Sequence, residues 1–141
     1  MTSEESVDLS TPDFKSLELY EGLSPVVADT LKFVESFRDF DTKHDYVFEE
    51  LRAELVNLLP TLADGYNRYH SGDKAEAYKD VRKSMSRVQS LLFLLNDLDF
   101  TKNEKSYRLA GRFENHLSHV NGLIRKMEEE GRMYEQEGEV A

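Results

Sequence analysis

Residues 78–95 read YKDVRKSMSRVQSLLFLL, and this stretch decides the fold because its apolar residues recur in steps of three and four. The seam within it consists of Tyr78, Val81, Met85, Val88, Leu92 and Leu95. The preceding segment repeats the pattern with Phe48, Leu51, Leu55, Leu58 and Leu62, and the following one with Ala110, Phe113, Leu117, Val120, Ile124 and Met127. Such spacing keeps one narrow apolar stripe facing a neighbouring helix at left-handed bundle angles. The sequence therefore predicts an all-α, antiparallel, up-down four-helix bundle.

The length and composition predict one domain with a substantial core, since 141 residues are enough to bury one. The chain has no cysteine, so it offers neither disulfides nor thiolate metal sites. No apolar run approaches the roughly 18 residues of a membrane span, and the polar start predicts a cytoplasmic protein. We expect a disordered acidic leader over residues 1–11, the bundle over 12–130 and a frayed acidic tail over 131–141.

The formal net charge of −10 is unevenly distributed along the chain. Residues 1–64 carry 15 acids and 5 bases, residues 65–126 carry 7 acids and 12 bases, and residues 127–141 carry 6 acids and 1 base. Global acidity argues against a general nucleic-acid binder. Because salt screens charges over roughly 8 Å, a basic patch in the middle block can still act locally.

Turn and cap residues predict where the helices begin. In the first helical segment, Ser24 is expected to act as an N-cap with Pro25 at the first helical position. The segment would then form two helical pieces or one kinked helix. Pro60 is expected to kink the second helix. Either Ser71 or Asp73 is expected to cap the third.

Residues 91–95 read LLFLL, which is more apolar than one seam requires. A helix that is apolar all round is buried on more than one side. Leu91, Phe93 and Leu94 are therefore predicted to form an oligomer interface, because exposed apolar patches mark contacts between proteins. The alternative is a locally wide core.

One segment carries a resemblance to a known family. Residues 62–68 read LADGYNR, and this segment is similar to the Ile-Ala-Glu-Gly-x-x-Arg motif of the bacterial four-helix-bundle family known as the 23S rRNA intervening-sequence proteins. The family's Gly-Ser pair appears as Lys83-Ser84, and its proline before the motif lies one place late, at Pro60. Residues 91–113 also resemble the branch of accessory variability determinants of diversity-generating retroelements, although Gly122-Leu123-Ile124 replaces that branch's Gly-Gly-Trp.

The resemblance implies a homopentamer of four-helix bundles that forms a barrel, and a non-enzymatic role. It also implies partners, since accessory proteins of that branch bind the reverse transcriptase and nucleic acid and support cDNA synthesis. The alternative is a protein–protein adaptor with no nucleic-acid role, which the acidic first half favours.

Basic residues on and before the third helix form the candidate nucleic-acid site: Arg68, Lys74, Lys79, Arg82, Lys83 and Arg87. At 100° per residue, the four on the helix fall opposite its apolar seam. They could track phosphates. The alternative is a solvated helix face paired with Glu76 and Asp80.

An enzyme hypothesis comes from Arg112, His116 and His119, which resemble the Arg-and-His ribonuclease signature of HEPN domains. An arginine that stabilises phosphate charge and a histidine that moves a proton form a workable pair. The nearest metal-ligand spacing is Asp41-x-x-His44, in a predicted turn. The sequence therefore predicts no metal, no cofactor and no catalytic site, with the ribonuclease as the rival hypothesis.

Overall fold

The computed structural model describes residues 11–37, 45–98 and 104–140, with only the backbone for the last five. A short 3-10 helix, η1 (Asp13–Ser16), is followed by α2 (Glu18–Glu35), α3 (Asp45–Asn67), α4 (Ser71–Asp97), α5 (Lys105–Glu114) and α6 (Leu117–Val140). Within these ranges the chain forms no strand, and the all-α prediction is confirmed. None of the described helices is long and apolar enough to cross a membrane.

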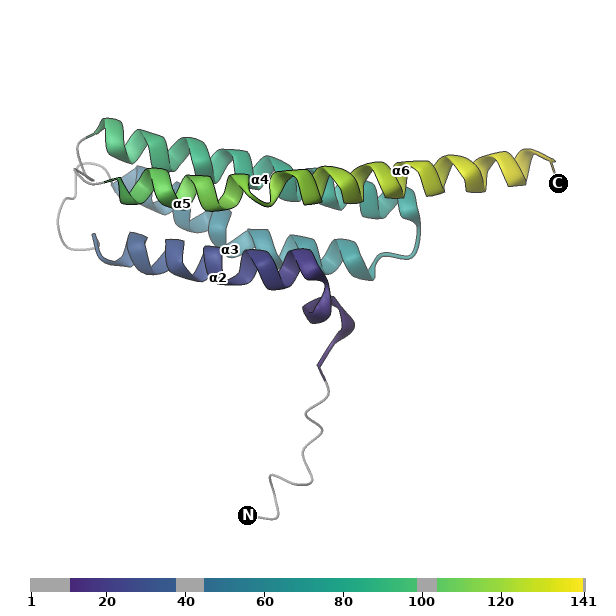
Figure 1. Ribbon diagram of the computed structural model, residues 1–141, viewed down its shortest axis with the longest axis horizontal. Helices are drawn as coiled ribbons and strands as arrows, with labels where there is room; N and C mark the ends of the chain where they lie inside the picture. Colours follow the sequence, from purple (N-terminus) through teal and green to yellow (C-terminus); the bar gives the residue numbers. More distant parts are fainter. Residues whose placement is uncertain (1–10, 38–44, 99–103, 141) are drawn as a thin grey trace, which may run out of the picture.

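The helices lie side by side as a bundle, in which α5 and α6 follow one another along the fourth side (Figure 1). The C-terminal ends of α2 and α4 lie at the same end of the bundle as the starts of α3 and α5, and the α3–α4 turn lies at the other (Figure 1). α4 packs against α3, α5 and α6, whereas α2 packs against α3 and α5. The last turns of α6 extend past the other helices (Figure 1).

The predicted seams form the core. All of the seam residues of α3 and α4 are buried, and Leu51, Leu58, Met85 and Leu92 have no exposed surface. The fourth seam is buried through Ala110, Phe113, Val120 and Ile124, while Leu117 and Met127 lie partly buried at its edge. α2 supplies the remaining side of the core with Leu19, Leu23, Val26, Val27, Phe33 and Val34.

The predicted N-cap at Ser24 is wrong, because α2 runs unbroken through Pro25. A proline inside a helix removes one backbone hydrogen bond, and Pro25 lies on the exposed side, where its ring meets water. Leu19 and Leu23 are fully buried on the turns before it, and their packing holds the helix together. Pro60 is likewise inside α3, which continues to Asn67.

The expected cap of α4 is also wrong. His70 is the N-cap residue and makes no side-chain cap bond, while Ser71 and Asp73 already lie inside the helix. Instead, the Ser71 hydroxyl donates to the Glu130 carboxylate of α6 at 3.1 Å. This contact joins the start of α4 to the far part of α6, so tertiary structure replaces the local cap.

The fourth helical segment forms two helices, where one was expected. It divides at Asn115 and His116 into α5 and α6. The His116 ring lies against Gly22 of α2, where an added Cβ would be 2.6 Å from the ring. Asparagine has low helix propensity, which favours a break at this point. α6 is helical to Val140, and the fraying expected from residue 131 stays a prediction. The predicted leader lies almost entirely outside the described residues.

At Gly65, α3 and α4 pack too closely for a side chain. A Cβ on Gly65 would lie 2.7 Å from the Ala77 Cβ and 3.2 Å from the Tyr78 ring. Both neighbours are buried, so neither can move away easily. Gly111 of α5 has nothing within 4 Å of the same position, so its missing side chain serves no packing purpose.

We predict that Gly65→Ala lowers the free energy of unfolding by about 1–3 kcal/mol, because it overpacks the α3–α4 contact. Gly111→Ala is the matched control and should raise it by up to about 1 kcal/mol, through higher helix propensity. Urea unfolding followed by circular dichroism at equal protein concentrations measures both. Equal effects of the two substitutions would contradict the close approach.

Candidate functional site

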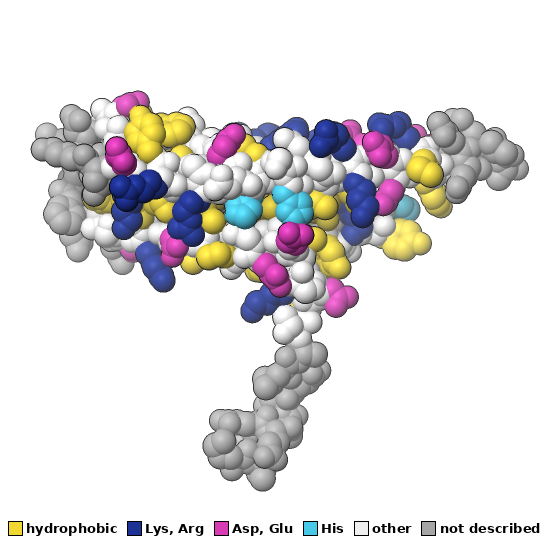
Figure 2. Space-filling view, viewed as in Figure 1, with side chains coloured by type: hydrophobic (Ala, Val, Ile, Leu, Met, Phe, Trp, Pro, Cys, Tyr) yellow, Lys and Arg dark blue, Asp and Glu magenta, His cyan; other side chains and the backbone are white. Residues whose placement is uncertain are grey.

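The end of α4 leaves apolar side chains outside the core. Leu92 and Leu95 are fully buried, Leu91 is half-buried, and Phe93 and Leu94 are each 39% exposed. Figure 2 shows hydrophobic side chains on the surface over the C-terminal end of α4. The stretch is thus both core and surface, so neither a wide core nor an interface describes all five residues.

The exposed residues continue onto α5. The Phe93 ring lies 5.0 Å from the ring of Tyr107, which is itself 48% exposed. Leu91 instead borders a shallow hollow shared with Glu50 and Glu54 of α3. We call Phe93, Leu94 and Tyr107 the α4–α5 apolar surface; Leu91 lies beside it, toward α3.

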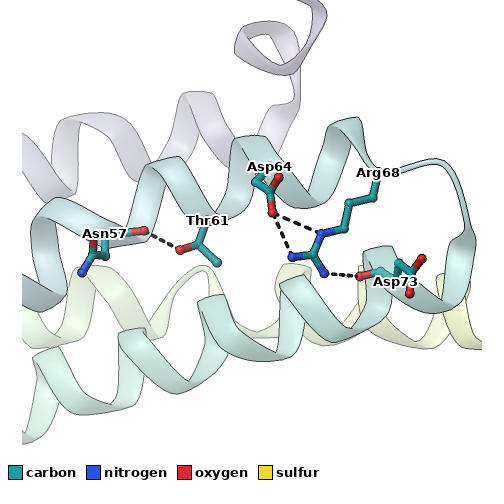
Figure 3. A network of polar contacts seen from close by, with 5 residues as sticks. All are labelled: Asn57, Thr61, Asp64, Arg68 and Asp73. Carbon is teal, nitrogen blue, oxygen red and sulfur yellow. Dashed lines mark hydrogen bonds and ion pairs between the residues drawn. The ribbon is translucent and has the colours of Figure 1, made fainter.

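Of the six predicted nucleic-acid-binding residues, Arg68 is held at the α3–α4 turn. Its guanidinium donates to the Asp64 carboxylate at 2.9 and 3.1 Å and to the Asp73 backbone carbonyl at 3.0 Å (Figure 3). One helical turn earlier, the Thr61 hydroxyl donates to the Asn57 carbonyl (Figure 3). Arg68 therefore closes the turn, and its charge is matched locally.

The two lysines that follow are also engaged. The Lys74 ammonium donates to the Tyr66 backbone carbonyl and lies 5.2 Å from the centre of the Tyr66 ring. Lys79 forms ion pairs with Glu76 at 3.3 Å and Glu128 at 3.4 Å. The hydrogen bond that Lys79 donates to the Glu76 carboxylate, with the charge of Glu128, raises the pKa of Lys79.

The remaining three residues point toward different neighbours. Arg82 donates to the Asn121 side chain of α6 at 2.9 Å, whereas Arg87 pairs with Glu54 of α3 at 3.1 Å. Lys83 is exposed between them. Five of the six predicted residues therefore have carboxylate, carbonyl or amide partners on α3, α4 or α6, which match part of their charge.

The candidate ribonuclease residues come together on the side of the bundle that faces α2. Arg112 pairs with Asp29 at 2.8 Å, and His116 packs against Gly22. Burial lowers the pKa of His116, and the charges of His119 and Arg112 lower it further. The guanidinium is thus already paired with one carboxylate.

The structure adds residues to this side that the sequence pattern did not single out. Lys32 of α2 and Lys105 of α5 join Asp29 and Arg112 around a hollow of about 320 Å³, which we call the α2–α5 hollow. Lys105 and Arg112 are one heptad apart, so their shared face could have been found from sequence. The contribution of Lys32 could not, because it depends on how α2 docks.

No group of three or more metal-ligating side chains occurs among the described residues. The predicted Asp41 and His44 spacing lies outside them. Comparison of the chain with family models, with curated proteins and with solved structures found no match. The family, its branch and the pentamer therefore stay predictions from the residues.

We predict that the stability of the protein falls as the pH drops below about 6.5, the ordinary histidine value. The pKa of His116 is lower in the folded chain, so the unfolded chain binds more protons in the interval beneath 6.5 and gains stability relative to the folded one. His116→Gln should reduce this fall between pH 6.5 and 5, measured by urea unfolding. His70→Gln is the control, and an identical profile for His116→Gln and the parent would contradict the assignment.

Proposed function

We propose that this chain is a non-catalytic, self-associating scaffold or accessory protein built on an up-down four-helix bundle. Its proposed partner is a reverse transcriptase or another nucleic-acid enzyme, as the resemblance implies. The observation that carries the proposal is the α4–α5 apolar surface, where Phe93, Leu94 and Tyr107 remain 39–48% exposed beside a fully packed core. Exposed aromatic and aliphatic side chains that gather in one place favour a protein contact.

Self-association is the proposed use of this surface. Because a ring assembly repeats one contact around its axis, a single apolar surface and the face opposite it are enough to build a closed oligomer. The pentamer number comes from the resemblance alone. The alternative use is binding to a different protein. The two hypotheses differ in whether the purified chain is already an oligomer.

The rival within the binding class is a protein–protein adaptor without nucleic-acid contact. The pairing of Arg68, Lys79 and Arg87 with carboxylates favours it. A variant distinguishes the nucleic-acid-binding hypothesis from the adaptor hypothesis. In this variant, Ala replaces Lys79, Arg82, Lys83 and Arg87. Loss of oligonucleotide binding and of its salt dependence would place the contact on α4, whereas unchanged binding would remove α4 from the nucleic-acid role.

The ribonuclease is the second candidate, favoured by the grouping of Arg112, His116 and His119 on one side of the bundle. In that reading a histidine moves the proton of an RNA hydroxyl and the arginine stabilises phosphate charge. We predict that the purified chain does not cleave RNA. Cleavage by the parent that His119→Ala abolishes, with the fold intact, would overturn the non-catalytic proposal.

We predict that Phe93→Asp combined with Leu94→Asp lowers the mass in solution to that of one chain, 16.4 kDa. A carboxylate at the centre of an apolar contact loses its hydration without gaining a partner. Sedimentation velocity measures the mass. Val56→Asp alters an exposed apolar side chain of α3 and is the control, expected to keep the mass of the parent. A double variant as heavy as the parent oligomer would contradict the assigned interface.

A further inference from the structure

The α2–α5 hollow brings cations from two helices to one place. Lys32 and Ser36 line it from α2, Lys105 and Arg112 line it from α5, and Phe33 and Leu109 add apolar lining. Figure 2 shows basic side chains gathered over α5 and the adjoining part of α2. The hollow therefore brings together residues that are far apart in the sequence and become neighbours only when the bundle folds.

The lining of the hollow contains three basic side chains. Lys32, Lys105 and Arg112 lie there beside the carboxylate of Asp29, whereas the chain as a whole carries −10. The hydrogen bond from Arg112 lowers the pKa of Asp29, and the charges of both lysines act in the same direction. The three cations are thus close enough to act on one anion together.

Two of these cations are held in position before any ligand arrives. Arg112 Nη1 donates to Asp29 at 2.8 Å, and a guanidinium carries five N–H donors in all. The Lys105 ammonium lies 5.6 Å from the centre of the Phe33 ring. Groups that are already ordered lose less conformational freedom on binding, which favours affinity.

The chemistry of the hollow suits phosphate better than a carboxylate. A phosphate offers several oxygens and up to two charges, which match a guanidinium fork beside two ammonium groups. A carboxylate would bring only one charge and two oxygens. The hollow has a volume of about 320 Å³, which leaves room for the group that carries the phosphate.

We infer that the α2–α5 hollow is a phosphate-binding site, formed by Lys32, Lys105 and Arg112, for a phosphorylated small molecule or the backbone of single-stranded nucleic acid. The inference does not depend on the scaffold proposal, because a bundle with or without a protein partner would present the same hollow. It also places phosphate binding on a different side of the bundle from α4.

The test compares two probes on the full chain. Inorganic pyrophosphate is titrated by calorimetry, and a labelled single-stranded oligonucleotide is titrated by fluorescence anisotropy over a range of salt. The double variant Lys32→Ala/Lys105→Ala should lower the affinity for each probe by about tenfold or more at low salt, since two nearby charges are lost. The oligonucleotide's logarithmic salt slope should fall by about 1.4, because each contact on a single strand contributes roughly 0.7.

Matched controls separate this site from general charge effects. Arg125→Ala/Lys126→Ala removes the same charge from the exposed side of α6 and should bind both probes as the parent does. Lys32→Arg/Lys105→Arg keeps the charge and should retain binding. Circular dichroism confirms that each variant is folded.

The outcomes decide both the site and the source of the phosphate. Much tighter binding of the oligonucleotide indicates a nucleic-acid backbone, and similar binding of pyrophosphate indicates a small phosphorylated molecule; both support the site. The phosphate site would be overturned if the parent protein bound neither probe, or if the Lys32/Lys105 variant bound both probes as tightly as the parent. Loss of binding only in the α4 variant would overturn it too, while leaving the nucleic-acid role of α4 intact.

Discussion

The close packing of α3 against α4 is the constraint on which the rest of the structure depends. Their seams have almost no exposed surface, and at Gly65 the two backbones approach so closely that a methyl group would collide with Ala77. α4 also packs against α5 and α6, so it is the helix that joins both halves of the bundle. Because the seam fixes the rotation of α4, it also fixes which of its residues face outward, including Phe93 and Leu94.

That rotation decides how the surface charges are used. On α4, Lys79 and Arg87 reach carboxylates on different neighbouring helices, so the basic residues stabilise the bundle rather than remaining available as one surface. Such exposed pairs contribute little stability individually, but each reduces the local positive field. In the α2–α5 hollow, Lys32, Lys105 and Arg112 lie together beside Asp29. The molecule thus presents an apolar contact surface and a basic hollow at separate places.

Periodicity predicted the core well because burial follows spacing, and spacing is a property of the sequence. Ser24 and Ser71 show where local rules fail: buried leucines carry α2 through Pro25, and Ser71 bonds Glu130 of a distant helix instead of capping its own. The break near His116 lies against Gly22 of another helix, a neighbour that exists only once the helices have docked. Likewise, the six basic residues were identifiable from sequence, but their partners on α3 and α6, and the approach of Lys32 to Lys105, exist only once the helices have docked.

The central claim is that the apolar surface left by the seam serves self-association. The native mass of the unmodified chain, measured by light scattering on a sizing column over a wide range of protein concentrations, tests it most directly. We expect a constant multiple of 16.4 kDa, with five chains as the number that the resemblance implies. A mass of 16.4 kDa at every concentration would contradict it and leave Phe93, Leu94 and Tyr107 as a contact for a different protein.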